Sequence, residues 1–199
     1  MKEKNMTKNT KITLSIVGVI AFLVIAIGGW YIMAQNSLRV SQQNVDQQWS
    51  NVEVQLQRRA DLTPQLVGAV KGNMKNEQKI FGNIADARKQ YDSANTPTDK
   101  VKASDNLNKQ TQVLINAVHE NYPQLASSAN VTSLMTQIEG SENRISQTRR
   151  DYNDSVTAYN RKVVSFPSSI VASNAGMKTK PFFQAAPTAS EAPKVDLGN

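Results

Sequence analysis

The strongest pattern in the chain is an apolar run near its N-terminus. Residues 12–33 read ITLSIVGVIAFLVIAIGGWYIM and contain no Asp, Glu, Lys, Arg or His. As an α-helix, this run is about 33 Å long, enough to cross a hydrocarbon core of about 30 Å. Trp30 and Tyr31 lie near its end, and such rings favour the membrane interface. The alternatives are a buried core helix and a cleaved signal peptide, but a signal peptide has a shorter apolar core of about 7–15 residues. We therefore predict an uncleaved transmembrane anchor over residues 12–33.

Helical periodicity continues beyond the apolar run. Apolar side chains recur at alternating spacings of four and three residues, which predicts a helix from Ala34 to about Gln57. Nothing between Met33 and Leu38 forces a break, so this helix can continue directly from the membrane span. Its apolar positions are Val45, Trp49, Val52 and Leu56.

Two further helices are predicted from helix-start signals. Thr63-Pro64 indicates a new start, because threonine can cap a helix and proline is tolerated in the first turn. This second helix extends to about Tyr91, and a third extends from Pro97 to about His119. The second helix contains glycines that cost about 1 kcal/mol each relative to alanine. Close packing against a neighbouring helix is one explanation for them: Gly68, Gly72 and Gly82.

The fourth predicted helix, from about Val131 to Ser165, has the clearest pattern in the chain. Apolar and aromatic side chains recur every seven residues. A second set of apolar positions lies between them and shifts by one residue further along the helix. Such drift is typical of a nearly straight helix and favours a bundle over a two-stranded coiled coil. The seven-residue positions are Val131, Ile138, Ile145, Tyr152, Tyr159 and Phe166.

These elements predict an all-α protein, with a single N-terminal transmembrane helix followed by an antiparallel four-helix bundle of long helices. The domain organisation is a basic segment over 1–11, the anchor over 12–33, the bundle over 34–176 and a mostly disordered tail over 177–199. Proline, alanine and serine dominate that tail. Phe182-Phe183 is its exception: the rings either dock back on the bundle or contact a membrane surface or partner.

Charge suggests an orientation in the membrane. Four lysines and one glutamate in the first eleven residues supply +3 of the net charge of +7. Only Arg39 follows within the next two dozen residues, so the positive-inside rule predicts a cytoplasmic N-terminus and an extracytoplasmic helical domain. Basic residues elsewhere are interspersed with acidic ones, which favours a solvated helical surface over nucleic-acid binding.

The composition restricts the possible chemistry. The chain has no cysteine and one histidine, His119. A thiolate zinc site, a HExxH helix and a catalytic cysteine are therefore excluded, and no phosphate-binding loop is present. We predict no catalytic residues, no cofactor and no metal. A hydrolase that uses Glu142 with His119 is the least favoured alternative.

Two polar clusters stand out in the predicted helical domain. Two interpretations of these clusters are possible. They form either an Arg–carboxylate network that sets the register of the helices, or a groove for an anionic ligand held by bidentate guanidinium contacts. We favour the structural network. One cluster lies near the first interhelical turn and the other on the fourth helix, and the candidate residues are Arg58, Arg59, Asp61, Glu142, Arg149, Tyr152 and Asn153.

The same segments resemble a known family. The stretch VQLQRRADLTPQLV over residues 54–67, IEGSENRI over residues 138–145 and RRDYN over residues 149–153 resemble signatures of the LemA family of bacterial membrane proteins. The resemblance extends in order from about Val40 to Phe183. It departs from the family pattern at Ala60, Thr63 and Gln65. It implies an N-terminal membrane helix and an all-α body, and it supplies no reaction.

Taken together, these features predict a membrane-anchored helical scaffold or adaptor of the bacterial cell envelope, without enzymatic activity. Its expected partners are the lipid bilayer and other envelope or membrane proteins, but not nucleic acid, and a homo-oligomer is possible. The alternative function is a ligand-binding or sensing module that uses the arginine-rich cluster between helices. The expected location is the cell membrane, with a single pass.

Overall fold

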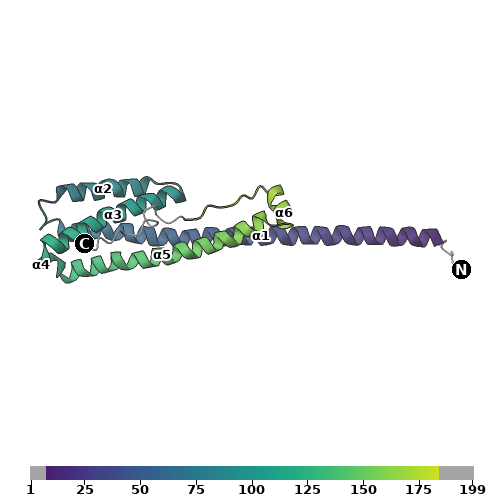
Figure 1. Ribbon diagram of the computed structural model, residues 1–199, viewed down its shortest axis with the longest axis horizontal. Coiled ribbons are helices and arrows are strands. Elements are labelled where there is room, and N and C mark those ends of the chain that lie inside the picture. The colour runs from purple at the N-terminus through teal and green to yellow at the C-terminus, as the bar shows by residue number, and fades with distance from the viewer. Residues whose placement is uncertain (1–7, 184–199) are drawn as a thin grey trace, which may run out of the picture. The chain divides into compact units, whose positions relative to one another are not determined.

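A computed structural model describes residues 8–183, and this part of the chain is helical and contains no strand. The predicted all-helical fold is therefore confirmed (Figure 1). The helices are α1 (Lys8–Val70), α2 (Gln78–Ser93), α3 (Pro97–Asn121), α4 (Pro123–Ala126), α5 (Ala129–Val164) and α6 (Ser168–Asn174).

The chain divides into two compact units. The first unit contains residues 1–46 and 153–199, and the second unit contains residues 47–152. The boundary between them lies within α1 and within α5. Each unit is described on its own below.

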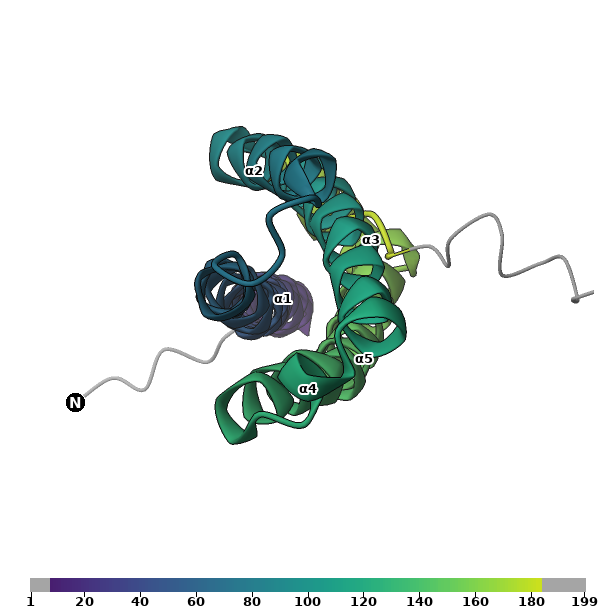
Figure 2. The ribbon, with the colours of Figure 1, turned by 90° about the vertical axis from the view of Figure 1, so that its left-hand side faces the viewer.

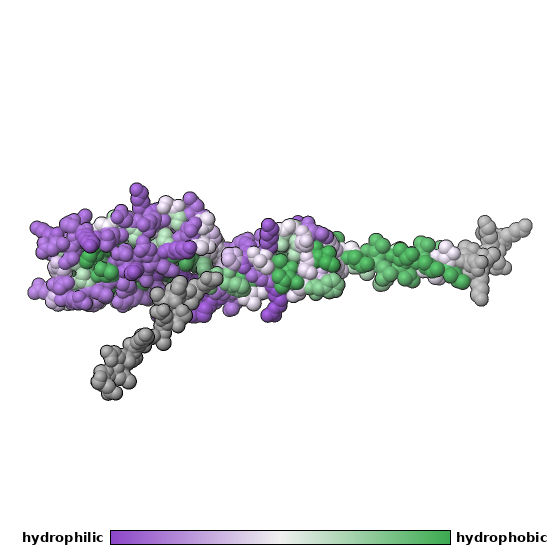
Figure 3. Space-filling view, turned by 45° about the horizontal axis from the view of Figure 1, so that its top comes forward, coloured by the Kyte–Doolittle hydropathy of each residue, from purple (hydrophilic) through white to green (hydrophobic). Residues whose placement is uncertain are grey.

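The N-terminal part of α1 carries the predicted apolar run. None of the 18 residues in its most apolar stretch is buried. Figure 3 shows this stretch as a continuous apolar surface. By length and composition, α1 therefore fits a membrane-spanning helix.

The prediction of a helix start at Thr63-Pro64 is wrong, because α1 continues through Pro64 to Val70. Proline lacks the N–H that would bond to the carbonyl four residues earlier, which belongs to Ala60. In the structure, Arg88 Nη1 donates to that carbonyl oxygen. The guanidinium group of Arg88, which belongs to α2, thus replaces the backbone N–H donor that is missing at Pro64.

The chain instead turns after Val70, within the stretch that was predicted to be the second helix. Residues 71–77 form turns between α1 and α2, and the side chain of Met74 is fully buried there. The suggested close packing at the glycines is also wrong. A Cβ atom built at Gly68, Gly72 or Gly82 would meet nothing within 4 Å.

The second unit has a core to which four helices contribute. Leu56 of α1, Ile84 of α2, Leu114 of α3 and Ile138 of α5 are all buried. Polar contacts link α1 to each of the other three helices, and α3 also contacts both α2 and α5. Figure 2 accordingly shows α2, α3 and α5 side by side around one side of α1. The antiparallel four-helix bundle itself stays a prediction.

The first unit has a smaller core, in which α6 packs against α1. Leu38 of α1 and Val171 and Ala172 of α6 are buried together. Partly buried side chains surround this cluster: Trp30, Tyr31, Ala34, Val163 and Met177. The short helix α6 was not predicted. It follows the end of α5, close to the predicted stop at Pro167.

After Gly176, whose φ of 66° suits a residue without a side chain, the chain has no regular secondary structure as far as Phe183, and Figure 1 shows it following an extended path. Most of the predicted disordered tail, residues 184–199, lies outside the described residues. So does most of the basic N-terminal segment.

Candidate functional site

The second unit buries a guanidinium group. Arg59 of α1 is only 3% exposed, and its Nη1 donates to Glu142 Oε2 on α5 at 2.5 Å. Its Nη2 donates to the hydroxyl of Ser104 on α3 at 2.8 Å and to the backbone carbonyl of the same residue at 3.2 Å. Arg59 therefore connects three helices through one side chain.

Burial is the main influence on the pKa of Arg59, which it lowers from its ordinary value, while Glu142 and Asp105 oppose that shift. An arginine stays protonated in proteins, so the charge is retained and needs its carboxylate partners. Both carboxylates are about half exposed, which lets water solvate their outer oxygen atoms.

Arg149 extends this network. Its Nη2 donates to Asp105 Oδ1 at 2.7 Å, and Arg59 Nη2 lies 3.8 Å from the same carboxylate oxygen. The structure thus brings together three predicted residues, Arg59, Glu142 and Arg149, with Ser104 and Asp105, which were not predicted. We call these five residues the Arg59 network.

Asp61 belongs to a separate cluster around Arg88 of α2. Arg88 Nη2 donates to Asp61 Oδ1 at 3.1 Å, and Arg88 Nε donates to Asp92 Oδ1 at 3.0 Å. Burial acts to lower the pKa of Arg88, but the hydrogen bonds to Asp92 and Asp61 outweigh it and raise the pKa. The predicted turn cluster is therefore divided: Arg59 points toward α3 and α5, and Asp61 toward α2.

Tyr91 is the buried aromatic residue beside Arg88. Lys100 Nζ lies 4.1 Å from the centroid of its ring, and Arg88 Cζ lies 5.9 Å from it. The hydroxyl donates to Gln57 Oε1 at 3.3 Å. Burial, followed by the nearby carboxylate of Glu53, raises the pKa of Tyr91 to about 12. This ring joins α2 to α1 as a neutral phenol stabilised by cation–π contacts.

The remaining candidates have different surroundings. Tyr152 is buried, and its ring packs edge-on against Trp49 with the centroids 6.1 Å apart. Arg58 is exposed and lies outside the Arg59 network.

Asn153 belongs to the first unit, where it holds the extended segment after α6. Its side-chain amide accepts from Phe183 N at 2.9 Å and donates to Phe183 O at 3.1 Å. Asn160 makes the same pair of bonds with Lys180, both at 2.8 Å. Asn153 and Asn160 are seven residues apart on α5, which is a rise of about 10.5 Å. Lys180 and Phe183 are three residues apart in the extended segment, which spans about 10 Å, so the two spacings match. We call Asn153 and Asn160 the asparagine clamp.

Sequence patterns carry partial signals for the residues that the prediction missed. The seven-residue spacing of the clamp is visible in the sequence, beside the aromatic positions Tyr152 and Tyr159. Arg88 and Asp92 have the helical spacing of an ion pair. Ser104 and Asp105 lie in the predicted helix from Pro97 to about His119, and no local pattern distinguishes them.

The part of the chain that the structure describes contains no group of three or more His, Asp or Glu side chains that could hold a metal ion. The two residues of the hydrolase alternative have different surroundings. Glu142 forms an ion pair with Arg59, and His119 is exposed in the last turn of α3.

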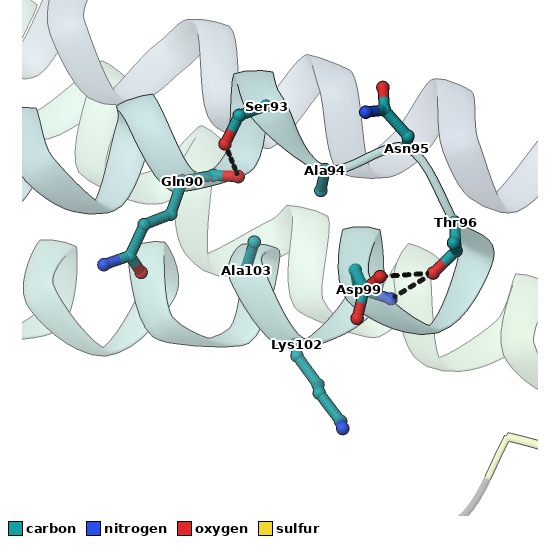
Figure 4. Close-up of a pocket in the computed structure, with 8 residues that line it drawn as sticks. All are labelled: Gln90, Ser93, Ala94, Asn95, Thr96, Asp99, Lys102 and Ala103. Atoms are coloured by element: carbon teal, nitrogen blue, oxygen red, sulfur yellow. Dashed lines mark hydrogen bonds between the residues drawn. The ribbon is translucent and has the colours of Figure 1, made fainter.

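A hollow of about 620 Å³ lies beside the turn between α2 and α3 (Figure 4). Its hydroxyl groups are used locally: Thr96 caps α3 by accepting from Asp99 N, and Ser93 donates to Gln90 O. The hollow is open and contains no histidine or cysteine.

The fold and these contacts define an all-helical protein whose one long apolar N-terminal helix fits a membrane protein. The chain belongs to the LemA family, whose model matches residues 48–197. The resemblance seen in the sequence is therefore confirmed.

The chain is also similar to several known bacterial proteins. Magnetosome protein MamQ 2 of Paramagnetospirillum magneticum is 25% identical over 199 residues, covering 87% of this chain and 71% of the relative. Magnetosome protein MamQ of Magnetospirillum gryphiswaldense is 24% identical over 201 residues, with coverages of 88% and 72%. Protein LemA of Metamycoplasma hominis is 26% identical over 184 residues, with coverages of 89% and 81%. None of these names indicates a catalytic activity.

Proposed function

We propose that this protein is a membrane-anchored, non-enzymatic helical scaffold of the bacterial cell envelope. The apolar part of α1 is the anchor, and the remaining helices form the body, which we propose to be an antiparallel bundle. The observation that carries this proposal is the complete exposure of the apolar window in α1. Leaving so much apolar surface in water is unfavourable, and a bilayer covers it.

The polar clusters support a scaffold rather than an enzyme. The Arg59 network and the Arg88 cluster join α1 to neighbouring helices through ion pairs and hydrogen bonds within the chain. Such contacts fix how helices pack. Family membership and similarity to the MamQ proteins support a membrane-associated helical protein, without assigning one cellular process.

The proposed orientation places the N-terminus in the cytoplasm and the helical body outside it, from the lysines before the span. Protease added to intact cells should then digest the body and spare a tag at the N-terminus. If the body is digested only after the cells are lysed, the orientation is the opposite of the one proposed.

The proposed partners are other envelope or membrane proteins, and Arg58 is the test position. Arg59 is unsuitable because its loss would disturb the Arg59 network, whereas Arg58 is exposed. Cross-linking of the full chain in native membranes should recover a reproducible partner that Arg58→Ala loses. Lys109→Ala, at an exposed position on α3, should keep it. A chain that purifies alone under mild conditions would contradict the scaffold.

A ligand-sensing function is the second candidate, and the geometry of Arg59 argues against it. The two terminal nitrogens of its guanidinium already donate to Glu142 and Ser104, so an anionic ligand would have to displace partners within the chain. A thermal shift of the detergent-solubilised chain by a small anion would favour the sensor, because a ligand at 100 times its dissociation constant adds about 2.7 kcal/mol.

A further inference from the structure

The first unit contains an exposed apolar corner where α5 ends and α6 begins. Phe166 is 81% exposed, and Ile170 of α6 is 52% exposed. Val164, the last residue of α5, is 65% exposed. We call Val164, Phe166 and Ile170 the apolar corner. These three large apolar side chains are exposed within seven residues of the chain, and contiguous exposed apolar surface marks a contact with a membrane or a partner.

The position of this corner along α1 is fixed by contacts within the first unit. Lys162 Nζ donates to Ser37 Oγ at 3.1 Å, and Val163 packs against the cluster around Leu38. The last residues of α5 therefore lie beside the segment of α1 that directly follows the apolar run.

The other side of α6 reaches the aromatic end of that run. Val171 and Ala172 share one cluster with Trp30 and Tyr31, so α6 lies at the level where the span ends. Figure 3 shows apolar patches among polar residues next to the continuous apolar stretch of α1. If Trp30 and Tyr31 lie at the membrane interface, as such rings prefer, the apolar corner is at interfacial depth too.

The charges around the corner have one sign. Residues 28–40 and 157–178 contain no aspartate or glutamate, and they carry four basic side chains: Arg39, Arg161, Lys162 and Lys178. Lys180, two residues further on, is paired with Asp46 and is not counted among them. A basic surface next to exposed apolar side chains is the pattern of a segment that binds an anionic membrane surface.

We infer that the apolar corner is a second membrane contact, in which Phe166 and Ile170 enter the interfacial region of the bilayer and the neighbouring basic side chains meet anionic headgroups. The inference rests on the proposed anchoring by α1. The corner then fixes how the first unit leaves the membrane, because α6 is held both to α1 and to the lipid.

Phe182, one of the two phenylalanines for which the sequence left a membrane contact open, is less suited to it. Its neighbour Lys180 pairs with Asp46, which is thirteen residues beyond Met33. That separation corresponds to about 20 Å along a helix, which is beyond the interfacial layer.

The chain has no cysteine, so single cysteines can carry an environment-sensitive fluorophore. The full chain is placed in nanodiscs that hold one copy each and contain phosphatidylglycerol. Labels are compared at Phe166→Cys, Ile170→Cys, Val113→Cys and Ile20→Cys. Val113 is an exposed position on α3, and Ile20 lies within the apolar run. Circular dichroism checks that each labelled chain keeps its helix content.

We expect the labels at Phe166→Cys and Ile170→Cys to emit at shorter wavelength than the label at Val113→Cys, and to be quenched several-fold less by iodide. Quenching at both corner positions equal to that at Val113→Cys, with Ile20→Cys shielded, would overturn the inference and leave the anchor intact. An unshielded label at Ile20→Cys would instead refute the anchor itself. Shielding only in discs that hold two copies would overturn the inference in favour of a dimer contact.

A second experiment tests the contribution of the basic side chains. Replacing phosphatidylglycerol with phosphatidylcholine, or introducing Arg161→Gln with Lys178→Gln, should reduce the shielding at Phe166→Cys. Lys102→Gln with Lys109→Gln, at two exposed positions on α3, removes the same charge and should leave the shielding unchanged. Equal shielding in both lipids would overturn the anionic-headgroup part of the inference.

Discussion

At the scale of single residues, the second unit depends on how a buried cation is satisfied. Arg59 is almost fully buried, whereas its partner Glu142 is about half exposed. The two ends of this ion pair are therefore not equivalent. Removing the buried end leaves polar groups of Ser104 without their donor and a carboxylate that water can solvate, whereas removing the charge of the exposed end leaves the buried guanidinium short of its counter-charge.

This difference gives a prediction for stability. Arg59→Met should lower the free energy of unfolding by about 1–3 kcal/mol, because the buried polar atoms of Ser104 lose a hydrogen bond. Glu142→Gln should cost more, about 3 kcal/mol or above, because the buried guanidinium loses its nearest carboxylate and Asp105 lies 3.8 Å away. Thermal unfolding of both variants in detergent, followed by circular dichroism, measures the difference. Equal losses would contradict the asymmetry.

Tyr91 gives a prediction for pH. Its pKa is raised from 10.0 to about 12 in the folded chain. Between those values, the unfolded chain loses this proton before the folded chain does, so stability is fully present below pH 10 and falls as the pH rises toward 12. The melting temperature of wild type should therefore decrease over this range.

Tyr91→Phe should remove part of that decrease, because phenylalanine does not ionise. The pKa of Tyr159 is also raised, mainly by burial, so Tyr159→Phe is the matched comparison in the first unit. A Tyr91→Phe chain with the full alkaline decrease would show that the phenol is not the group responsible.

The sequence predicts which residue types form the polar clusters, but not how they are paired. Arg59 and Asp61 are close in sequence and were placed in one cluster, yet they lie on different sides of α1 and contact different helices. Pairing across helices depends on rotation about the helix axis. Local spacing does not specify that rotation when Ser104 and Asp105, the partners on α3, have no distinguishing pattern.

At the scale of helices, Pro64 shows why a local rule can fail. Proline inside a helix costs about 3 kcal/mol in isolation, partly because one carbonyl loses its donor. Arg88, which is distant in sequence, supplies a donor to that carbonyl of Ala60. The sequence pattern thus predicts the long helices of the body and the bounds of α3 and α5 well. It misplaces the break between the first two helices because a tertiary contact compensates for the proline.

A double-mutant cycle tests this compensation. Arg88→Met should cost about 1–2 kcal/mol in wild type, since the carbonyl of Ala60 is left unsatisfied in addition to the lost ion pairs. In a Pro64→Ala background the same change should cost less, because the backbone N–H at position 64 can bond to that carbonyl. Unfolding free energies of the four chains give the coupling. Strict additivity would refute this role of Arg88.

The asparagine clamp gives a prediction for the segment of residues 177–183 that it holds. Asn160→Ala removes both hydrogen bonds to Lys180, so the amide of Lys180 should exchange with deuterium faster than in wild type. Hydrogen exchange read by mass spectrometry over residues 177–183 measures this change. Asn83→Ala, at an exposed position on α2, should leave the exchange unaltered. Unchanged exchange in Asn160→Ala would show that other contacts hold the segment.

At the scale of the whole molecule, the account depends on the apolar part of α1. Every apolar side chain of its most apolar window faces outward, while the helices of each unit bury their own cores. Composition and length were sufficient to identify this segment from the sequence. The short helix α6 was not identified, because its seven residues, SSIVASN, carry too little periodicity to distinguish a helix from a loop.

The most direct test of anchoring is alkaline carbonate extraction of membranes from cells that express the full chain. We predict that the intact chain stays in the membrane pellet. A Val17→Lys/Val24→Lys chain should be extracted, because each lysine near the centre of a span costs about 2.5–3.5 kcal/mol. Release of the wild-type chain into the soluble fraction, with its apolar segment still attached, would contradict the account.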